Sequence, residues 1–119
     1  MTKVLIVEDN ELNRELIQDI LDGNGIDWLS APGGAAAIEI LRAETVDIVL
    51  MDLQMPEMDG FQTLQEIQRL LGESAPPIIA VTGNAMEVDR KRCLDSGFAD
   101  FLKKPFRIQN FLEVLQSHL

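Results

Sequence analysis

Apolar residues fall into short continuous clusters that recur at regular spacing along the chain. Three of them, at 4–7, 48–51 and 78–81, read VLIV, IVLM and IIAV and are rich in β-branched side chains. Uninterrupted runs of this length are typical of strands buried on both faces, as in parallel sheets. Weaker clusters at 26–30 and 98–102 predict two further strands.

Helical spacing of apolar residues fills the segments between these clusters. The pattern predicts that Asp59 caps the third helix and that the GNG at 23–25 ends the first. A β-α unit repeated five times predicts an α/β fold with a doubly wound parallel sheet and helices on both faces. The expected helices lie at 11–22, 35–43, 61–71 and 84–97, with a last one beginning near Ile108.

Length and composition fit one globular domain over residues 1–119, and we expect no output domain. The single cysteine, Cys93, excludes a disulfide within the chain and a zinc site of paired cysteines. It favours a cytoplasmic location. No apolar run approaches the roughly 18 residues of a membrane span, so membrane insertion is not expected.

The formal net charge of −10 is unevenly distributed along the chain. Residues 1–89 hold 17 acids and 4 bases, whereas residues 90–119 hold 3 acids and 6 bases. An acidic domain repels nucleic acid, so direct DNA binding is not expected.

Polar side chains follow four of the five predicted strands. Because the carboxyl ends of parallel strands share one edge, these side chains should converge on a single crevice. They are Glu8 and Asp9 after the first strand, Asp52 after the third, Thr82 after the fourth, and Lys103 and Lys104 after the fifth.

Three carboxylates in one crevice repel one another, so we expect a cation that offsets their charge. Oxygen ligands without histidine or cysteine suit Mg²⁺. Asp52 could also attack phosphorus to form an aspartyl-phosphate, with Lys104 and Thr82 as partners of the phosphoryl group. Each residue also has a plain structural interpretation as a helix-opening acid or a turn residue, and His118 is expected to be solvated.

The motifs VLIVEDN, DIVLMDLQMPEMDG, IIAVTGNA and GFADFLKKPF together resemble response-regulator receiver domains of two-component and phosphorelay signalling. These motifs are most similar to those of receivers in hybrid sensor kinases and of stand-alone single-domain receivers. The resemblance covers the whole chain and implies the flavodoxin-like (βα)5 fold with strand order 2-1-3-4-5.

The resemblance also implies residue roles. Asp52 would be the phosphoacceptor, with Mg²⁺ bound by Glu8, Asp9, Asp52 and the Gln54 main-chain carbonyl. Thr82 and Phe101 would form the switch, although Phe101 replaces the commoner tyrosine. A sensor histidine kinase or histidine phosphotransfer protein would supply the phosphoryl group and dock on the first helix, at Leu12, Asn13 and Leu16. Turnover as a conventional enzyme is not expected, beyond self-catalysed phosphorylation and dephosphorylation.

Charge placement suggests where a downstream protein binds. We hypothesise that a basic face meets an acidic partner and that phosphorylation tunes this contact; its residues are Arg90, Lys91, Arg92, Phe101, Lys103 and Arg107. A solvated helix face is the alternative for residues 90–92.

Three rival functions fit the sequence less well, and the first of them is the alternative that is kept. They are a pseudo-receiver that binds partners without phosphorylation, a flavodoxin-like flavin protein and a haloacid-dehalogenase-type phosphatase. The segment after the first strand would repel a flavin phosphate, and Gln54 stands where the phosphatase needs a second acid.

Overall fold

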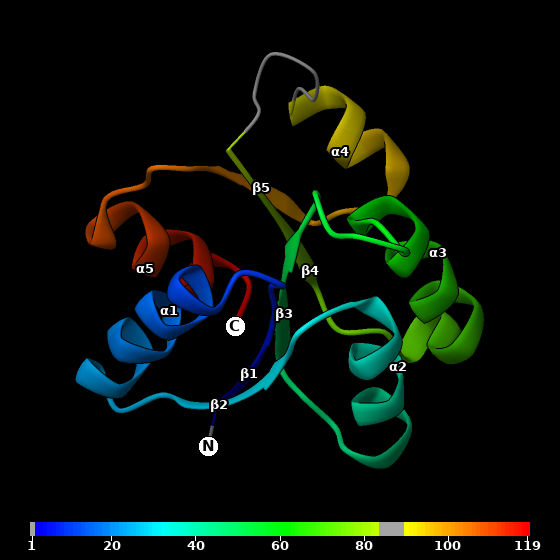
Figure 1. Ribbon diagram of the computed structural model, residues 1–119, viewed down its shortest axis with the longest axis horizontal. Coiled ribbons are helices and arrows are strands. Elements are labelled where there is room, and N and C mark those ends of the chain that lie inside the picture. The colour runs from blue at the N-terminus through cyan, green and yellow to red at the C-terminus, as the bar shows by residue number, and fades with distance from the viewer. Residues whose placement is uncertain (1, 84–89) are drawn as a thin grey trace.

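The computed structural model describes residues 2–83 and 90–119 and centres on a five-stranded parallel sheet (Figure 1). The strand order is β2-β1-β3-β4-β5, as expected. Every residue of β3 and β4 is buried, which explains their uninterrupted apolar sequences. The strands are β1 (Lys3–Val7), β2 (Asp27–Ala31), β3 (Ile48–Asp52), β4 (Ile78–Thr82) and β5 (Asp100–Lys103).

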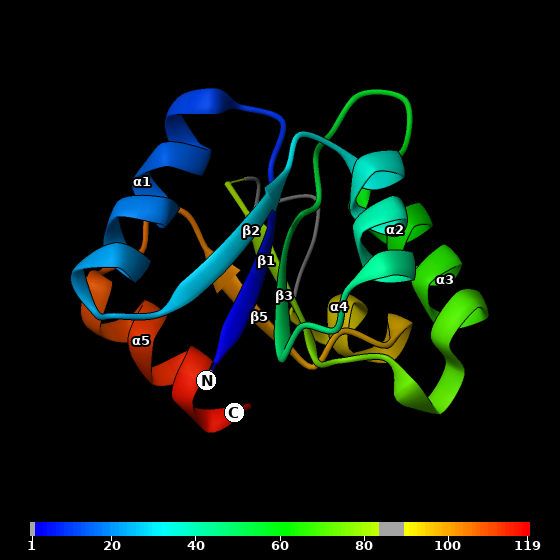
Figure 2. The ribbon, with the colours of Figure 1, turned by 90° about the horizontal axis from the view of Figure 1, so that it is seen from below.

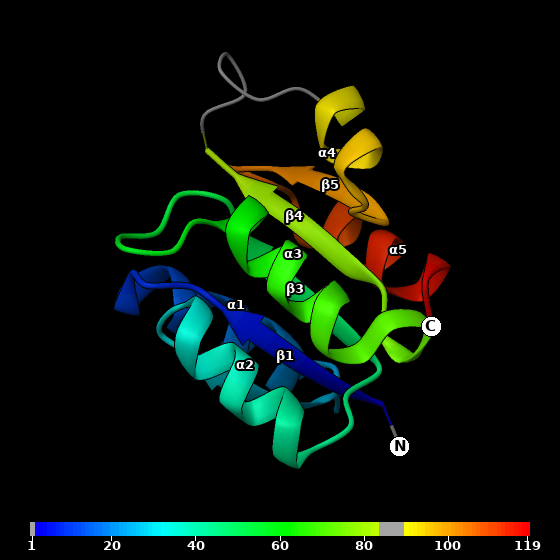
Figure 3. The same cartoon turned by 90° about the vertical axis from the view of Figure 1, so that its right-hand side faces the viewer.

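Helices cover both faces of the sheet. Figure 2 shows α1 and α5 on one side and α2, α3 and α4 on the other. In Figure 3, α4 lies near the β5 edge, while α2 and α3 run beside each other. The helices are α1 (Glu11–Gly23), α2 (Gly34–Ala43), α3 (Gly60–Leu71), α4 (Arg90–Ser96) and α5 (Ile108–Ser117), with a 3-10 turn, η1, at Gly72–Ser74.

Each face of the sheet has its own apolar core. Phe111 and Leu115 of α5 pack with Leu21 of α1 on the first face. Leu64 and Ile67 of α3 belong to the core of the other face. Among the described residues no helix is both long enough and apolar enough to cross a bilayer.

Most expected elements are confirmed to within a residue or two, including the Asp59 cap, which forms a capping box with Gln62. The strand expected at 98–102 was placed too early, because β5 begins at Asp100. Gly97 has φ +115° and ends α4, after which the Phe98 amide returns to the Cys93 carbonyl. Of the helix expected at 84–97, the first six residues lie outside the described part of the chain.

The expectation that His118 is merely solvated was wrong. Its Nε2 lies 3.0 Å from Asp100 Oδ2, and Asp100 Oδ1 lies 3.3 Å from the Arg90 guanidinium. The histidine and arginine partners and the Phe101 amide hold the pKa of Asp100 below its ordinary value, although burial opposes them. Asp100 thus joins the start of α4 to the end of α5.

Gly60 brings the start of α3 against the end of β3. A Cβ at this position would lie 2.7 Å from the Asp52 carbonyl oxygen and 2.8 Å from the Leu53 Cα. The Gly60 amide also donates to the Leu53 carbonyl at 3.1 Å. The glycine of the MDG sequence therefore fixes the backbone that carries Asp52.

Replacing Gly60 with alanine should destabilise the domain by about 1–3 kcal/mol, because main-chain atoms must move to admit the methyl group. Gly23→Ala is the matched control, since no atom lies within 4 Å of a Cβ there. Urea unfolding followed by fluorescence of Trp28, the sole tryptophan, measures both variants. Equal free energies of unfolding of Gly60→Ala and Gly23→Ala would contradict the close approach of Gly60 to the end of β3.

Candidate functional site

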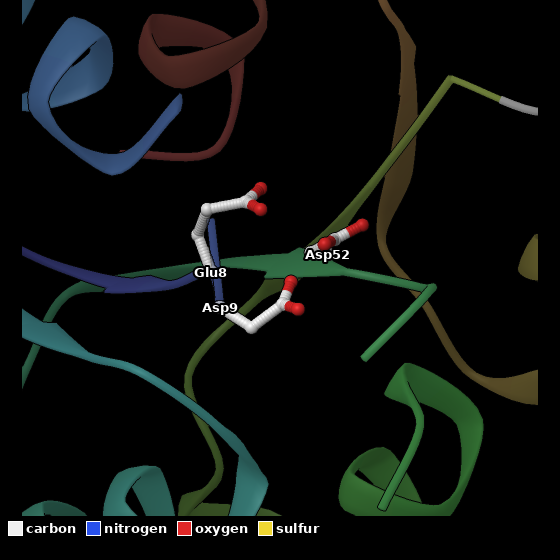
Figure 4. A group of neighbouring side chains, drawn as sticks. All are labelled: Glu8, Asp9 and Asp52. Carbon is white, nitrogen blue, oxygen red and sulfur yellow. The ribbon is translucent and has the colours of Figure 1, made fainter. Parts of the chain in front are cut away.

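Three acidic side chains meet where β1 and β3 end at the carboxyl edge of the sheet. Glu8 and Asp9 follow β1 directly, and Asp52 is the last residue of β3. Figure 4 shows the three carboxylates turned toward one another. One oxygen from each lies within 4.8 Å of the other two, so the expected convergence is confirmed.

The three acids differ in their exposure to water. Glu8 is 2% exposed and Asp52 is 6% exposed, whereas Asp9 is exposed. A buried carboxylate loses hydration and needs a compensating charge or hydrogen bond. Glu8 and Asp52 are therefore the two acids for which neutralisation matters most.

Lys104 supplies a positive charge from the far end of the chain. Its Nζ lies 2.8 Å from Glu8 Oε2 and 3.9 Å from Asp52 Oδ1. Its amide donates to the Thr82 carbonyl at 2.7 Å, and a cis peptide follows it to Pro105. As expected, Lys104 rather than Lys103 reaches the acids, and Lys103 is exposed at the end of β5.

The electrostatic balance remains negative at Asp52. Burial, followed by repulsion from Glu8, raises the pKa of Asp52 to about 7. Lys104 and the Gln54 amide, which donates to Asp52 Oδ1 at 3.2 Å, oppose this rise. The single ammonium is thus insufficient for the acids around it.

A pocket of about 300 Å³ opens over these groups. Gln54 and Gly83 line it together with Lys104 and the three acids. Thr82 is fully buried at the end of β4, and the pocket lining at this strand is Gly83 rather than Thr82. Phe101 is half-buried and packs toward the α3 side of the sheet.

An adjoining groove of about 410 Å³ runs between α1 and the segment after β5. It shares Asn13, Gly83 and Lys104 with the acidic pocket. Leu16, which lines the groove, is 56% exposed, and Leu12 on the same helix is 76% exposed. The sequence analysis named these leucines as a docking site but not three other residues that line the groove: Ile17, Pro105 and Phe106. The KKPF sequence at 103–106 contains the last two.

The basic residues of α4 have specific contacts of their own. Arg90 pairs with Asp100, and the Arg92 guanidinium lies 4.4 Å from the centre of the Phe61 ring. Within α4 only Cys93 is buried, so the described part of this helix has a thin apolar face. Arg90 and Arg92 therefore have partners within the fold, but all three bases at 90–92 are exposed, so the solvated-face alternative stays open.

The raised pKa of Asp52 makes metal-free stability depend on pH. Between about pH 4 and 7 the folded state binds a proton that the unfolded state lacks, so the free energy of unfolding falls as pH rises. Asp52→Asn removes this titration. Between about pH 5 and pH 8, the free energy of unfolding of the variant should rise by about 2 kcal/mol relative to that of wild type.

Urea denaturation at several pH values, with a chelator present, measures this difference. If the free energies of unfolding of the variant and of wild type differed by the same amount at every pH, the raised pKa of Asp52 would be contradicted. His118→Ala is a useful comparison because it removes a contact with Asp100 just after α5, in a part of the fold that holds neither Asp52 nor Glu8.

Comparison with known proteins identifies the class. The family model for the response regulator receiver domain matches residues 4–116, and the chain belongs to this family of two-component signalling domains. The polar-differentiation response regulator DivK of Brucella ovis is 35% identical over 120 residues, covering 100% of this chain and 98% of that protein.

Solved structures agree with this assignment. The receiver domain of sensor histidine kinase PA1611 from Pseudomonas aeruginosa, with magnesium coordinated in its active site cleft, is 33% identical. Its TM-score is 0.89 over 98% of this chain and 96% of that one. The Ssk1 receiver domain of Saccharomyces cerevisiae, in complex with the histidine phosphotransfer protein Ypd1, is 25% identical with a TM-score of 0.89. That match covers 98% of this chain and 88% of the yeast one.

Proposed function

We propose that this domain accepts a phosphoryl group from a phosphohistidine onto Asp52, with Mg²⁺ as cofactor. The observation that supports this most is the pairing of a nearly buried Asp52 with Lys104 across a pocket that holds two further acids. The chain would act as a receiver domain in the cytoplasm. Its chemistry would be limited to its own phosphorylation and dephosphorylation.

The donor atoms suit Mg²⁺. All three acids offer oxygen ligands within a small region, and the raised pKa of Asp52 reflects unneutralised negative charge. Glu8, Asp9 and Asp52 would hold the ion together with the main-chain carbonyl of Gln54. When bound, Mg²⁺ supplies positive charge that favours ionised Asp52 and offsets the charge of a phosphoryl group.

Asp52 would act as the nucleophile in phosphoryl transfer. A carboxylate oxygen forms a bond to phosphorus while the phosphorus–nitrogen bond to the donor imidazole breaks, and the imidazole keeps the electron pair. Lys104 is placed to neutralise the transferred group, and the Thr82 hydroxyl would contact it. Attack of water on phosphorus later restores the free carboxylate.

The groove beside α1 is suited to the phosphodonor. It opens into the acidic pocket through residues common to both, so a partner lying in the groove can bring a histidine to Asp52. Leu12 and Leu16 offer exposed apolar area at this place, with Asn13 between them. The complex of the yeast relative with a histidine phosphotransfer protein supports a partner of this kind.

Phosphorylation would then change the α4–β5 side of the domain. A phosphoryl group at Asp52 would draw Thr82 toward it, and Phe101 would repack behind it to shift α4. The downstream partner would be an acidic protein surface. All five bases of the proposed face are exposed, and this face would meet the partner beside Phe101; the bases are Arg90, Lys91, Arg92, Lys103 and Arg107.

The nucleophile can be tested with acetyl phosphate and Mg²⁺. Wild type should gain one phosphoryl group that hydroxylamine removes, as it removes acyl phosphates in general. Asp52→Asn should gain none while remaining folded, because amide and carboxylate are nearly the same size. Intact-protein mass spectrometry measures the gain, and an unmodified wild type would favour a pseudo-receiver instead.

The donor groove can be tested by separating partner transfer from small-molecule transfer. Leu12→Ala with Leu16→Ala should slow phosphotransfer about tenfold, the equivalent of about 1.4 kcal/mol of lost contact. The donor is whichever phosphorylated histidine phosphotransfer protein reacts fastest with wild type in a panel.

Labelling by acetyl phosphate should be unchanged in this double variant, since its acids are intact. Leu70→Ala is the control, because Leu70 is also an exposed leucine, at 37%, but lies on α3 away from the groove. An equal effect of both changes, or a loss of small-donor labelling, would contradict the docking site.

A further inference from the structure

Arg14, on the first turns of α1, contacts the loop that carries two of the acids. Its NH1 donates to the main-chain carbonyl oxygen of Glu8 at 2.9 Å, and the side chain is half-buried. That carbonyl belongs to the peptide group joining Glu8 to Asp9. The arginine therefore restrains the orientation of the peptide group that precedes the Asp9 Cα, to which the Asp9 side chain is attached.

Glu8 is fixed by several other contacts. Its amide donates to the Ala31 carbonyl at 3.1 Å, and its carboxylate accepts from Lys104 at 2.8 Å and from the Asn10 amide at 3.2 Å. Removing one contact would leave this residue in place.

Asp9 differs because its carboxylate has no hydrogen-bond or ion-pair partner within residues 2–83 and 90–119. It is also exposed, so packing does not hold it. The direction of this carboxylate depends on the backbone at residues 8 and 9, and Arg14 is the side chain that restrains that backbone from α1.

We propose that Arg14 is a positioning residue for Asp9, so that it favours cation binding although it carries a positive charge. This inference rests on the proposed metal site. Two physical effects of Arg14 oppose each other here. Its charge repels a divalent cation, whereas its hydrogen bond pre-orients a ligand, and residues that orient metal ligands typically account for 10–100-fold in metal affinity.

The direction in which one substitution changes the Mg²⁺ affinity separates the two effects. Arg14→Met should weaken Mg²⁺ binding about tenfold if positioning dominates. Arg42→Met is the control that removes the same charge near the end of α2, at the opposite edge of the sheet, where Arg42 is exposed and pairs with Glu39 at 3.6 Å. Amide chemical shifts followed through a MgCl₂ titration give both dissociation constants.

A loss of fivefold or more relative to Arg42→Met supports the positioning role, and any smaller loss or a tighter constant overturns it. If Arg14→Met does not fold, Arg14→Lys replaces it, since it keeps the charge but lacks the guanidinium group that donates to the Glu8 carbonyl.

A metal-free measurement keeps this test separate from the proposed function. The ¹⁵N order parameter of the Asp9 amide should fall in the Arg14 variant from the rigid-backbone value of about 0.85 toward 0.6. An unchanged order parameter overturns the inference. If wild type itself binds no Mg²⁺, the proposed metal site fails, while this measurement still decides whether Arg14 restrains the loop.

Discussion

The site depends on the enclosure of two carboxylates, Glu8 and Asp52, with one ammonium group, Lys104, between them. Burying one charge pair is tolerable when the geometry is good, but a second carboxylate beside it has no full partner. The fold accepts this because β1 and β3 are neighbouring parallel strands whose ends cannot separate without breaking the sheet. The apolar core therefore imposes the repulsion between the two carboxylates. In the proposed function, a divalent cation would relieve it.

The contacts around this pair show how the fold keeps the site in place. Gly60 allows α3 to approach the Asp52 backbone, and the Lys104 amide is anchored on the Thr82 carbonyl. Arg14 holds the peptide before Asp9. Each of these contacts involves main-chain atoms, so the backbone positions the site.

Much of this could be predicted from the sequence, for a physical reason. Strands buried on both faces require continuous apolar runs, and the ends of parallel strands share an edge, so Glu8, Asp9, Asp52 and Lys104 had to converge. Contacts of long side chains could not be predicted in this way. The Arg92–Phe61 stack and the Asp100–His118 pair depend on how α4 and α5 rest on the sheet. The start of β5 was also missed, because Phe98 is as apolar as a strand residue yet packs edge-on against Phe61 in the turn before the strand.

Negative charge at Asp52 exceeds what Lys104 neutralises. A ¹³C NMR titration of the Asp52 side-chain carboxyl tests this directly, in metal-free protein and again with saturating Mg²⁺. We expect a metal-free pKa of about 7, raised by burial and by Glu8, and a clear fall in this pKa when the cation is added. A midpoint near the ordinary value of 3.8 that Mg²⁺ leaves unchanged would contradict this expectation.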